Sequence, residues 1–324
     1  MSSTFHKHPI IFYNVENLFD TFNDKLLLGN DEFSLEGSKL WDDERYQMKL
    51  NRLAEALLLV NGSTPLVFGM AEIENRKVVE DLIKTDPLAH RNYQIVHYNS
   101  EDRRGVDCAF VYDAGFIEAD LEMKLIIEVD DEPYFRTRDI IYVKAKLADQ
   151  HIVHFFVNHW PSRREGISES ESRRKFAAAT LRTEIDKILH TDKDANIIVM
   201  GDFNDTPENF SIRTILRAKG QHEQTPGDLI NLLIEEQKQG HGTTVHQREW
   251  DVFDQLIVSQ GLLQGQSGLE INEHNAFIAR NKELIFTFPD GGQKPSATYG
   301  GDRYHGGYSD HLPVFLNLKE KNGN

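Results

Sequence analysis

Short apolar runs recur along this chain and limit the ways in which it can fold. Eight of them are four to eight residues long and have the composition of buried β-strands. They lie at Ile10–Tyr13, Leu66–Met70, Cys108–Tyr112, Ile140–Leu147, Ile152–Val157, Ile197–Met200, Phe253–Val258 and Pro313–Leu318. We therefore expect a core built from short strands that are hidden from solvent.

Segments with helical periodicity lie between several of these runs. They are Asp43–Val60, Lys77–Lys84 and Ser172–His190, with two shorter patterns at Ser211–Lys219 and Asp228–Gln237. In the first segment, the apolar residues between positions 50 and 60 follow a 3-4-3 spacing, which places them on one face of a helix. Interspersed strands and helices indicate an α/β or α+β protein. Because no repeat or Pro/Gly-rich linker divides the chain, we expect a single domain over residues 1–324.

Polar side chains stand at the ends of six of the apolar runs. Four runs lead into carboxylate, amide or imidazole groups, and two begin with them: Asn14 and Glu16, Glu72 and Glu74, Asn158 and His159, Asp202 and Asn204, then Asp254, and Asp310 with His311. Antiparallel neighbours bring the start of one strand beside the end of another, so one edge of a mixed sheet can gather all six groups. Asn and Asp also form turns after strands, as at Asp205 and Asn209, and this simpler explanation holds for any single position. Six positions together favour a shared site.

The charge of the chain argues against a protein that coats nucleic acid. Its 36 Lys and Arg residues and 52 Asp and Glu residues give a formal net charge of −16 at pH 7. General nucleic-acid binding needs a basic face, and binding to anionic membranes needs basic clusters. Any contact with nucleic acid is therefore expected to be local or assisted by a metal. The single cysteine, Cys108, excludes an internal disulfide and a cysteine-rich zinc module.

The N-terminal segment has no sign of an export signal. It lacks the apolar run of about 7–15 residues that a signal peptide contains. No segment approaches the roughly 20 apolar residues that cross a bilayer. We therefore expect a cytoplasmic protein without a transmembrane segment, although a secreted or periplasmic protein that had lost its leader would look the same. The sequence indicates no obligate protein partner.

Seven motifs occur in an order that resembles a known superfamily. They are NVEN (14–17), AEIEN (71–75), RGVDCAFVY (104–112), VNHWPSR (157–163), GDFND (201–205), DQLIVS (254–259) and YSDHLPV (308–314). This series resembles the endonuclease/exonuclease/phosphatase superfamily, which includes nucleases of the DNase I type. The combination of GDFN and SDHLPV in this order is its most specific part. The resemblance extends over nearly the whole chain, from residue 11 to residue 318.

The resemblance implies a fold and a cofactor. The fold is an α+β, four-layer α/β/β/α sandwich of two mixed β-sheets, as in DNase I. The chemistry is metal-dependent hydrolysis of a phosphate ester, in which a cation and positioned donors stabilise the charge of the transition state. Mg²⁺ is the expected cofactor, with Mn²⁺ as the alternative, because both suit carboxylate and amide oxygens.

The resemblance also implies a role for each motif residue. The metal would be held by Glu72 as principal ligand, with Asn14 beside it, Glu16 as a second acidic ligand and Asp310 directly or through water. Catalysis would fall to Asp202 and Asn204, which orient the attacking water, and to His159 and His311, which contact the phosphate or transfer a proton. Asp254 would hydrogen-bond a catalytic histidine and fix its tautomer.

Three further residues are expected to bind substrate: Arg104, Asn158 and Arg163. The arginine forks suit phosphate oxygens. Arg164 has two interpretations of equal weight, a contact with phosphate or an ion pair with Glu165 or Glu169. Gly306 and Gly307 are expected to allow a close approach of the backbone before Asp310.

The leading functional hypothesis is a metal-dependent phosphodiesterase, nuclease-like, that uses water for in-line attack. Its substrate would be nucleic acid or a small phosphodiester. One alternative is a phosphomonoesterase that acts on a soluble sugar phosphate or a lipid headgroup, and another is a catalytically silent binding protein with the same fold. A serine hydrolase, a P-loop enzyme and a zinc protease are disfavoured, because the chain has no GxSxG, GxxxxGK[ST] or HExxH motif.

Overall fold

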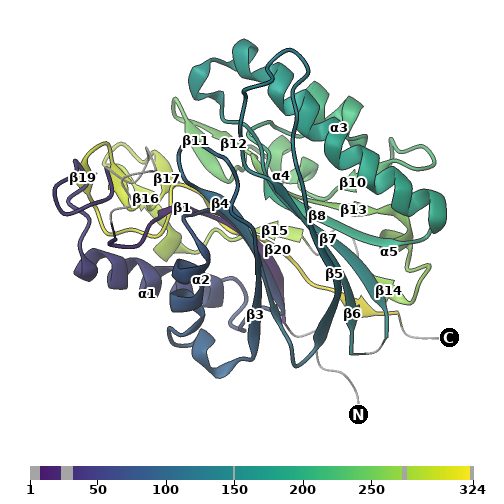
Figure 1. Cartoon of the computed structure of the whole chain (residues 1–324), viewed down its shortest axis with the longest axis horizontal. Helices are drawn as coiled ribbons and strands as arrows, with labels where there is room; N and C mark the ends of the chain where they lie inside the picture. The colour runs from purple at the N-terminus through teal and green to yellow at the C-terminus, as the bar shows by residue number, and fades with distance from the viewer. Residues whose placement is uncertain (1–7, 23–31, 149, 272–275, 322–324) are drawn as a thin grey trace.

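Two large sheets form the centre of the molecule in the computed structural model, which describes residues 8–22, 32–148, 150–271 and 276–321 (Figure 1). The first seven residues of the N-terminal segment considered above lie outside these ranges. The first sheet has the order β15 (Ala276–Ile278), β20 (Val314–Leu316), β1 (Ile10–Leu18), β2 (Val67–Ile73), β4 (Asp107–Asp113), β3 (Tyr93–His97). The second has the order β5 (Ile117–Leu125), β6 (Ile140–Leu147), β7 (Ile152–His159), β8 (Asn196–Asp202), β13 (Asp254–Ser259), β10 (Leu229–Asn231), β9 (Ala218–Lys219). Both sheets are mixed, since β1 and β2 are parallel in the first, as are β7 and β8 in the second.

Helices cover the outer faces of the two sheets. They are α1 (Asp43–Leu59), α2 (Arg76–Ile83), α3 (Ile167–Thr191), α4 (Ile234–Lys238) and α5 (Gln260–Gln264). Figure 1 places α1 and α2 on the side of the first sheet and α3 along the second. The buried face of α3, with Ala177, Leu181 and Ile185, packs on Phe156 and Val199 of the second sheet. The predicted α+β four-layer sandwich is confirmed.

Short elements complete the described chain. Four two-stranded sheets stand apart from the large sheets: β11 (Thr244–His246) with β12 (Glu249–Asp251), β14 (Leu269–Glu270) with β21 (Lys319–Glu320), β16 (Ile285–Thr287) with β17 (Gln293–Pro295), and β18 (Tyr299–Gly300) with β19 (Arg303–Tyr304). There are 3₁₀ turns at η2 (Leu88–His90), η3 (Arg163–Glu165) and η6 (Lys282–Leu284), and one π-helical turn at η4 (Ser211–Ile215). None of the helices in the described ranges has both the length and the apolar character needed to cross a bilayer.

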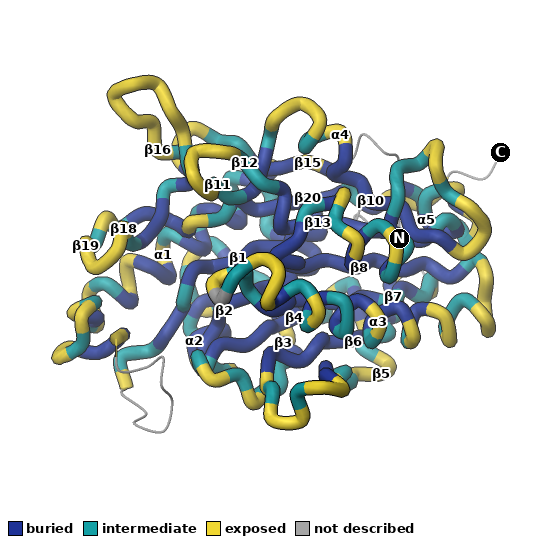
Figure 2. The backbone as a smooth tube through the Cα atoms, turned by 90° about the horizontal axis from the view of Figure 1, so that it is seen from above, coloured by how far each residue is buried: buried dark blue, intermediate teal, exposed yellow. Residues whose placement is uncertain are grey.

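The core lies between the sheets, where the strands are almost entirely buried (Figure 2). The two sheets approach closely at Gly69 of β2. A Cβ atom added there would lie 2.6 Å from Met200 Sδ and 3.2 Å from Val157 Cγ1, both in the opposite sheet. Phe110 of the first sheet and Phe155 of the second are also in contact, with ring centroids 5.1 Å apart. This packing fixes the positions of the strand ends in both sheets relative to one another.

All eight predicted strands are present, and the differences from prediction have local causes. Among the strands that were not predicted, β3 and β5 are the longest, and their alternating or largely exposed residues give no apolar run. The segment Asp228–Gln237 is not one helix, since Leu229–Asn231 pairs with β13 and only Ile234–Lys238 is helical. Sheet pairing overrides the local helical pattern there. Helix α3 begins at Ile167, before the predicted start at Ser172.

The prediction of a single sheet edge needs one correction. The polar strand ends belong to two sheets, with Asn14 and Glu72 on the first and His159 and Asp202 on the second. The face-to-face packing of the sheets still places these ends at one end of the sandwich. Within the second sheet, the strand register brings the polar residues together, because Asp202 lies opposite His159 on β7 and opposite Asp254 on β13.

Candidate active site

Irregular backbone at the strand ends directs several of the predicted side chains. Glu16, Glu72 and Asn204 adopt left-handed backbone conformations, with φ of 54°, 64° and 49°. The strand register shifts between Asn14 and Leu18 and between Ala71 and Ile73, as in β-bulges. A bulge changes the direction of a side chain, and a non-glycine residue in this region costs roughly 1–3 kcal/mol. Three such residues among the predicted site residues point to a functional constraint on these strand ends.

A chain of hydrogen bonds and close contacts connects four of the predicted residues. His311 Nδ1 and Asp254 Oδ2 lie 2.6 Å apart, and His311 Nε2 is 3.9 Å from Asp202 Oδ2. The same oxygen of Asp202 accepts a 2.9 Å hydrogen bond from Asn14 Nδ2. Asp254 is fully buried and Asp202 nearly so, so both hold fixed positions. In this arrangement the carboxylate of Asp254 is placed to fix the tautomer of His311.

A second group of contacts centres on Glu72. Its Oε1 accepts a 3.1 Å hydrogen bond from Arg104 Nη1, and its Oε2 accepts one from the backbone of Asn17. His159 Nε2 stands between two carboxylates, 3.9 Å from Glu72 Oε1 and 3.7 Å from Asp202 Oδ2. His159 therefore joins the Glu72 group to the Asp202 group.

The two groups face one cavity of about 150 Å³. Seven predicted residues line it: Glu72, Arg104, His159, Asp202, Asn204, Asp310 and His311. Ser162, Arg164 and Phe253 form part of the wall, and Thr244, Val245 and His246 of β11 form another part. The predicted strand ends thus converge on a single small polar space.

The two histidines of the cavity have pKa values that are shifted in opposite directions. Burial and the charge of Arg138 hold the pKa of His159 well below its ordinary value, so this ring is neutral. Burial also opposes the charge on His311, but Asp254 and Asp202 outweigh it and raise the pKa of His311 well above the ordinary value. Burial raises the pKa of Asp202 to about 6, against the opposing charge of His311. The cavity therefore holds one neutral ring, one charged ring and a carboxylate suited to accepting a proton near neutral pH.

The sequence matches the endonuclease/exonuclease/phosphatase family over residues 9–320. The chain belongs to this family. A comparison with curated proteins gives no match. Among solved structures, a mannosyl-6-phosphatase from Bacteroides thetaiotaomicron VPI-5482 is similar with a TM-score of 0.59 and 14% identity, over 96% of this chain and 99% of that one.

Two eukaryotic structures are also similar. A humanized TDP2 from D. rerio gives a TM-score of 0.58 at 15% identity, over 96% of this chain and 98% of that chain. The human nocturnin catalytic domain, solved with a bound sulfate anion, gives a TM-score of 0.53 at 15% identity, over 97% of this chain and 95% of that chain. At these identities the likeness shows the fold alone. The family membership shows a phosphoesterase fold.

The donor atoms at the cavity fit the divalent metal that this family implies. Glu72 and Asp310 of the cavity lining offer hard oxygen donors, the kind that Mg²⁺ prefers. Asn14 does not line the cavity and adjoins it through its hydrogen bond to Asp202. Burial raises the pKa of Asp310, and the charge of Glu72 raises it further, so the two carboxylates repel each other in a way that a cation would relieve. Asp202, Asp254 and His311 also present ligand atoms within 4.8 Å of one another. The ligand set itself stays a prediction.

Glu16 lies apart from this cavity in the structure. Its two carboxylate oxygens accept hydrogen bonds from the backbone of Thr298 (2.6 Å) and of Tyr299 (3.1 Å). Lys49, itself buried, donates to Thr298 Oγ1 from the other side. Burial, reinforced by Asp310, raises the pKa of Glu16 to about 7. Glu16 thus anchors the chain at the start of β18. A polar residue at a strand end has the same sequence pattern in this structural role as in the role of a metal ligand.

The structure also does not bring Asn158 and Arg163 to the cavity. Asn158 is fully buried, where its amide donates to Met200 O and its oxygen accepts from Trp160 Nε1. Arg163 donates to Asn204 O at 2.6 Å and to Asp205 Oδ1 at 2.8 Å. Both therefore support the strand ends and the loop after β8 rather than facing the cavity.

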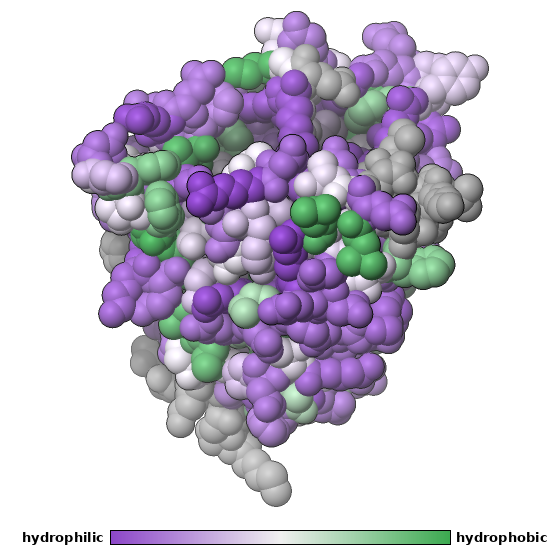
Figure 3. Space-filling view, turned by 90° about the vertical axis from the view of Figure 1, so that its left-hand side faces the viewer, coloured by the Kyte–Doolittle hydropathy of each residue, from purple (hydrophilic) through white to green (hydrophobic). Residues whose placement is uncertain are grey.

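The cavity wall includes Arg164, for which the sequence left two interpretations open, and two residues that were not predicted, Thr244 and His246. Arg164 is exposed, and within the described side chains it has no ion pair with Glu169; the side chain of Glu165 lies outside the description. Thr244 and His246 come from β11, a short polar hairpin strand with no sequence signal of its own. Figure 3 shows the end of the molecule that carries β16–β19, where hydrophilic side chains predominate and apolar ones form small separate areas.

Two glycines of the motifs allow close approaches of the backbone, and one supports a prediction. At Gly307 a Cβ atom would lie 2.2 Å from Ser296 O, as the sequence predicts. At Gly201 it would lie 2.5 Å from Asn158 O on the adjacent strand.

We expect Gly201→Ala to separate β7 from β8 and to lower the free energy of unfolding by about 1–3 kcal/mol, with a loss of activity. Urea unfolding would measure the first effect. Gly220→Ala is the matched control, since its nearest neighbour would be 3.8 Å away, and equal stability of the two variants would contradict the argument.

Proposed function

We propose that this protein is a divalent-metal-dependent phosphodiesterase, nuclease-like in its chemistry, that uses water for in-line attack on phosphorus. The observation that carries the proposal is the convergence of Glu72, Asp202 and His311 on one cavity. A carboxylate, a charged imidazole and hard oxygen ligands at one phosphate-sized space suit hydrolysis of a phosphate ester.

Each side chain has a proposed task. Asp202 accepts the proton of the attacking water, which Asn204 helps to orient, while the new P–O bond forms. The charged His311, held by Asp254, donates a hydrogen bond to the phosphate, and the neutral His159 donates a second from its N–H. The ester bond to the leaving oxygen breaks, and the departing alkoxide takes a proton from the aqueous side of the cavity.

Asn14, Glu72 and Asp310 would hold the metal, which when bound neutralises phosphate charge and stabilises the departing oxygen. Arg104 would place the phosphate against Glu72. Of the substrate-binding predictions, Arg104 is therefore the one that we carry into the proposal.

The surroundings of the cavity support a diester over a monoester. β11 forms one wall, and the wall at Ser162 and Arg164 is shared with a second cavity of about 510 Å³. A diester has a group on each side of its phosphate, and the second cavity offers room for one of them. The second candidate is a phosphomonoesterase for a phosphorylated sugar. The small volume of the first cavity and the likeness to a mannosyl-6-phosphatase favour it.

A pair of chromogenic substrates separates these candidates. We expect wild-type protein to hydrolyse bis(p-nitrophenyl) phosphate in the presence of Mg²⁺ or Mn²⁺, faster than p-nitrophenyl phosphate, and to stop when EDTA is added. Cleavage of the monoester alone would move the assignment to the phosphatase. Hydrolysis that continued unchanged in EDTA would remove the metal from the proposal.

Metal binding also has a readout that does not involve turnover. A ligand that binds only the folded state at about 100 times its Kd stabilises it by roughly 2.7 kcal/mol. We expect Mg²⁺ to raise the Tm of the wild-type protein and to do so much less in Glu72→Gln. Glu118→Gln is the control, because it makes the same change on an exposed residue of β5. The same Mg²⁺ shift in all three proteins would rule out Glu72 as a principal ligand.

A further inference from the structure

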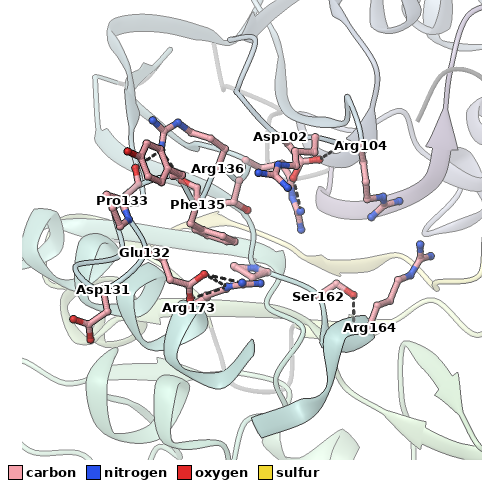
Figure 4. Close-up of a pocket in the computed structure, with 15 residues that line it drawn as sticks. Asp102, Arg104, Asp131, Glu132, Pro133, Phe135, Arg136, Ser162, Arg164 and Arg173 are labelled. Carbon is pink, nitrogen blue, oxygen red and sulfur yellow. Dashed lines mark hydrogen bonds and ion pairs between the residues drawn. The ribbon is translucent and has the colours of Figure 1, made fainter. Parts of the chain in front are cut away.

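A large arginine-lined cavity adjoins the candidate active site. It has a volume of about 510 Å³ and six arginines in its lining: Arg103, Arg104, Arg136, Arg138, Arg164 and Arg173. Three carboxylates, Asp102, Asp131 and Glu132, also line it. Arg104, Ser162 and Arg164 belong to this wall and to the wall of the active-site cavity. Arg104 and Arg164 extend from opposite sides toward the same space (Figure 4).

Three of these arginines have fixed positions within the cavity wall. Arg138 is buried and donates to Asp102 Oδ2 at 2.8 Å and to Trp160 O at 2.7 Å. Arg173 forms a two-pronged contact with Glu132 and lies over the ring of Phe135, 4.4 Å from its centroid. Arg136 is paired with Glu101. These contacts hold the segment 130–138 in place and give the cavity a preformed shape.

Two arginines remain available for a ligand. Arg103 and Arg164 are exposed, and in the described ranges neither has a carboxylate within ion-pair distance. This stands against the balance of the whole chain, in which 52 Asp and Glu residues outnumber 36 Lys and Arg residues. Both also line a third cavity of about 390 Å³, which extends the same positive wall toward Lys39. The excess of positive charge is thus concentrated beside the site that takes a phosphate.

We propose that this cavity binds a second phosphate group of the substrate, next to the phosphate that is cleaved. The proposal rests on the proposed phosphodiesterase function and names its substrate class, a diester that carries a further phosphate. Guanidinium forks bind phosphate oxygens in pairs, and the unpaired Arg103 meets this requirement without breaking an existing contact. The volume falls within the roughly 300–1,000 Å³ of small-molecule sites, so a phosphate with its attached group fits.

The attached group can be a nucleoside or a sugar, and the cavity offers surfaces for either. Tyr134 lines it with 82% of its surface exposed, as a ring on which a base or a sugar face can stack. The phosphate chemistry is common to both sources. The experiment therefore contains one arm for each of them.

The test compares pairs of substrates that differ by one phosphate. The first pair is a dinucleoside monophosphate with and without a 5′-terminal phosphate. The second is a p-nitrophenyl phosphodiester of a hexose with and without a phosphate on a neighbouring hydroxyl. In one pair at least, we expect kcat/KM of the wild type to be about 10–100-fold higher for the phosphorylated member, mainly through KM. The preference should weaken as salt is raised.

Arg103→Gln should remove this preference and leave hydrolysis of the unphosphorylated members unchanged, because Arg103 does not line the active-site cavity. Arg164→Gln should lower both, since it lines both cavities. Lys282→Gln removes the same charge from a side chain that is 91% exposed, outside these cavities, and should keep the wild-type preference. A preference in the first pair alone identifies a nucleotide source, and one in the second pair alone a sugar source.

Two outcomes would overturn the inference, and a third separates it from the proposed function. Equal kcat/KM within both pairs, or a preference that survives in Arg103→Gln, would show that the cavity binds no second phosphate. If no diester is hydrolysed at all, the proposed function fails. The cavity is then tested alone, by calorimetric binding of the phosphorylated dinucleotide in EDTA to wild-type protein and to Arg103→Gln. Binding that is weakened in the variant supports the inference, and equal binding overturns it.

Discussion

Replacing Asp202 by asparagine is expected to lower kcat for a phosphodiester by about 10²–10⁴-fold, the range for loss of a positioned acid or base. Asparagine keeps the size of the side chain and can still hydrogen-bond Asn14. It cannot accept the proton of water, and it removes the negative charge beside His311 and His159. Since burial holds the pKa of Asp202 near 6, the wild-type carboxylate is both charged and basic at neutral pH.

The measurement is steady-state hydrolysis of the diester with saturating Mg²⁺, together with the Tm of each protein. Asp302→Asn is the matched control, because it makes the same change on a side chain that is 72% exposed and pairs with Lys39. We expect the control to retain wild-type kcat. A value for Asp202→Asn within threefold of the wild type, in folded protein, would exclude Asp202 as the base.

The strand ends of the site could be predicted because their signal is local. An apolar run that switches abruptly to Asn, Asp, Glu or His shows both that a strand is buried and that it ends at a polar surface. Asp202, His159 and Asp254 were expected together for this reason, and the register pairs them directly. The division of these ends between two sheets could not be predicted, because strand order depends on contacts between distant segments.

Side-chain direction was the part that the sequence could not supply. Glu16 and Glu72 both follow apolar runs, yet only Glu72 faces the cavity, and a bulge with positive φ at each decides the direction. Arg163 and Arg164 are adjacent in the chain, and the 3₁₀ turn that contains both sends one inward to Asp205 and the other to the cavity. Such a turn has no periodicity that could show this in advance.

The structural role of Asp205 also depends on side-chain contacts that the sequence could not show. The sequence allowed it as a turn former after β8. The structure instead buries it, with Oδ1 2.8 Å from Arg163 Nη2 and 2.8 Å from Arg174 Nε. Arg174 is fully buried in α3, so this ion pair ties the helix to the loop that follows the catalytic strand. Asn209 does act in the turn, as its side chain accepts from the backbone of Thr206.

Asp205→Asn is therefore expected to destabilise the protein by about 3–5 kcal/mol, because it leaves the buried guanidinium of Arg174 without a counter-charge. Burial already lowers the pKa of Arg174, which indicates how poorly this charge is solvated. The free energy of unfolding in urea measures the effect. Asp86→Asn, at a side chain that is 81% exposed, should change it by less than about 0.5 kcal/mol.

The double variant Asp205→Asn/Arg174→Met decides whether the cost comes from the unpaired charge. If it does, replacing Arg174 by an apolar side chain of similar length removes that charge, and the double variant should be more stable than Asp205→Asn alone. If the loss instead reflects the hydrogen bonds of Asp205 with Ser211 and Arg163, the second substitution would restore nothing. An additive double-mutant cycle would thus assign the stability to the loop after β8, and a strongly non-additive one to the bond between that loop and α3.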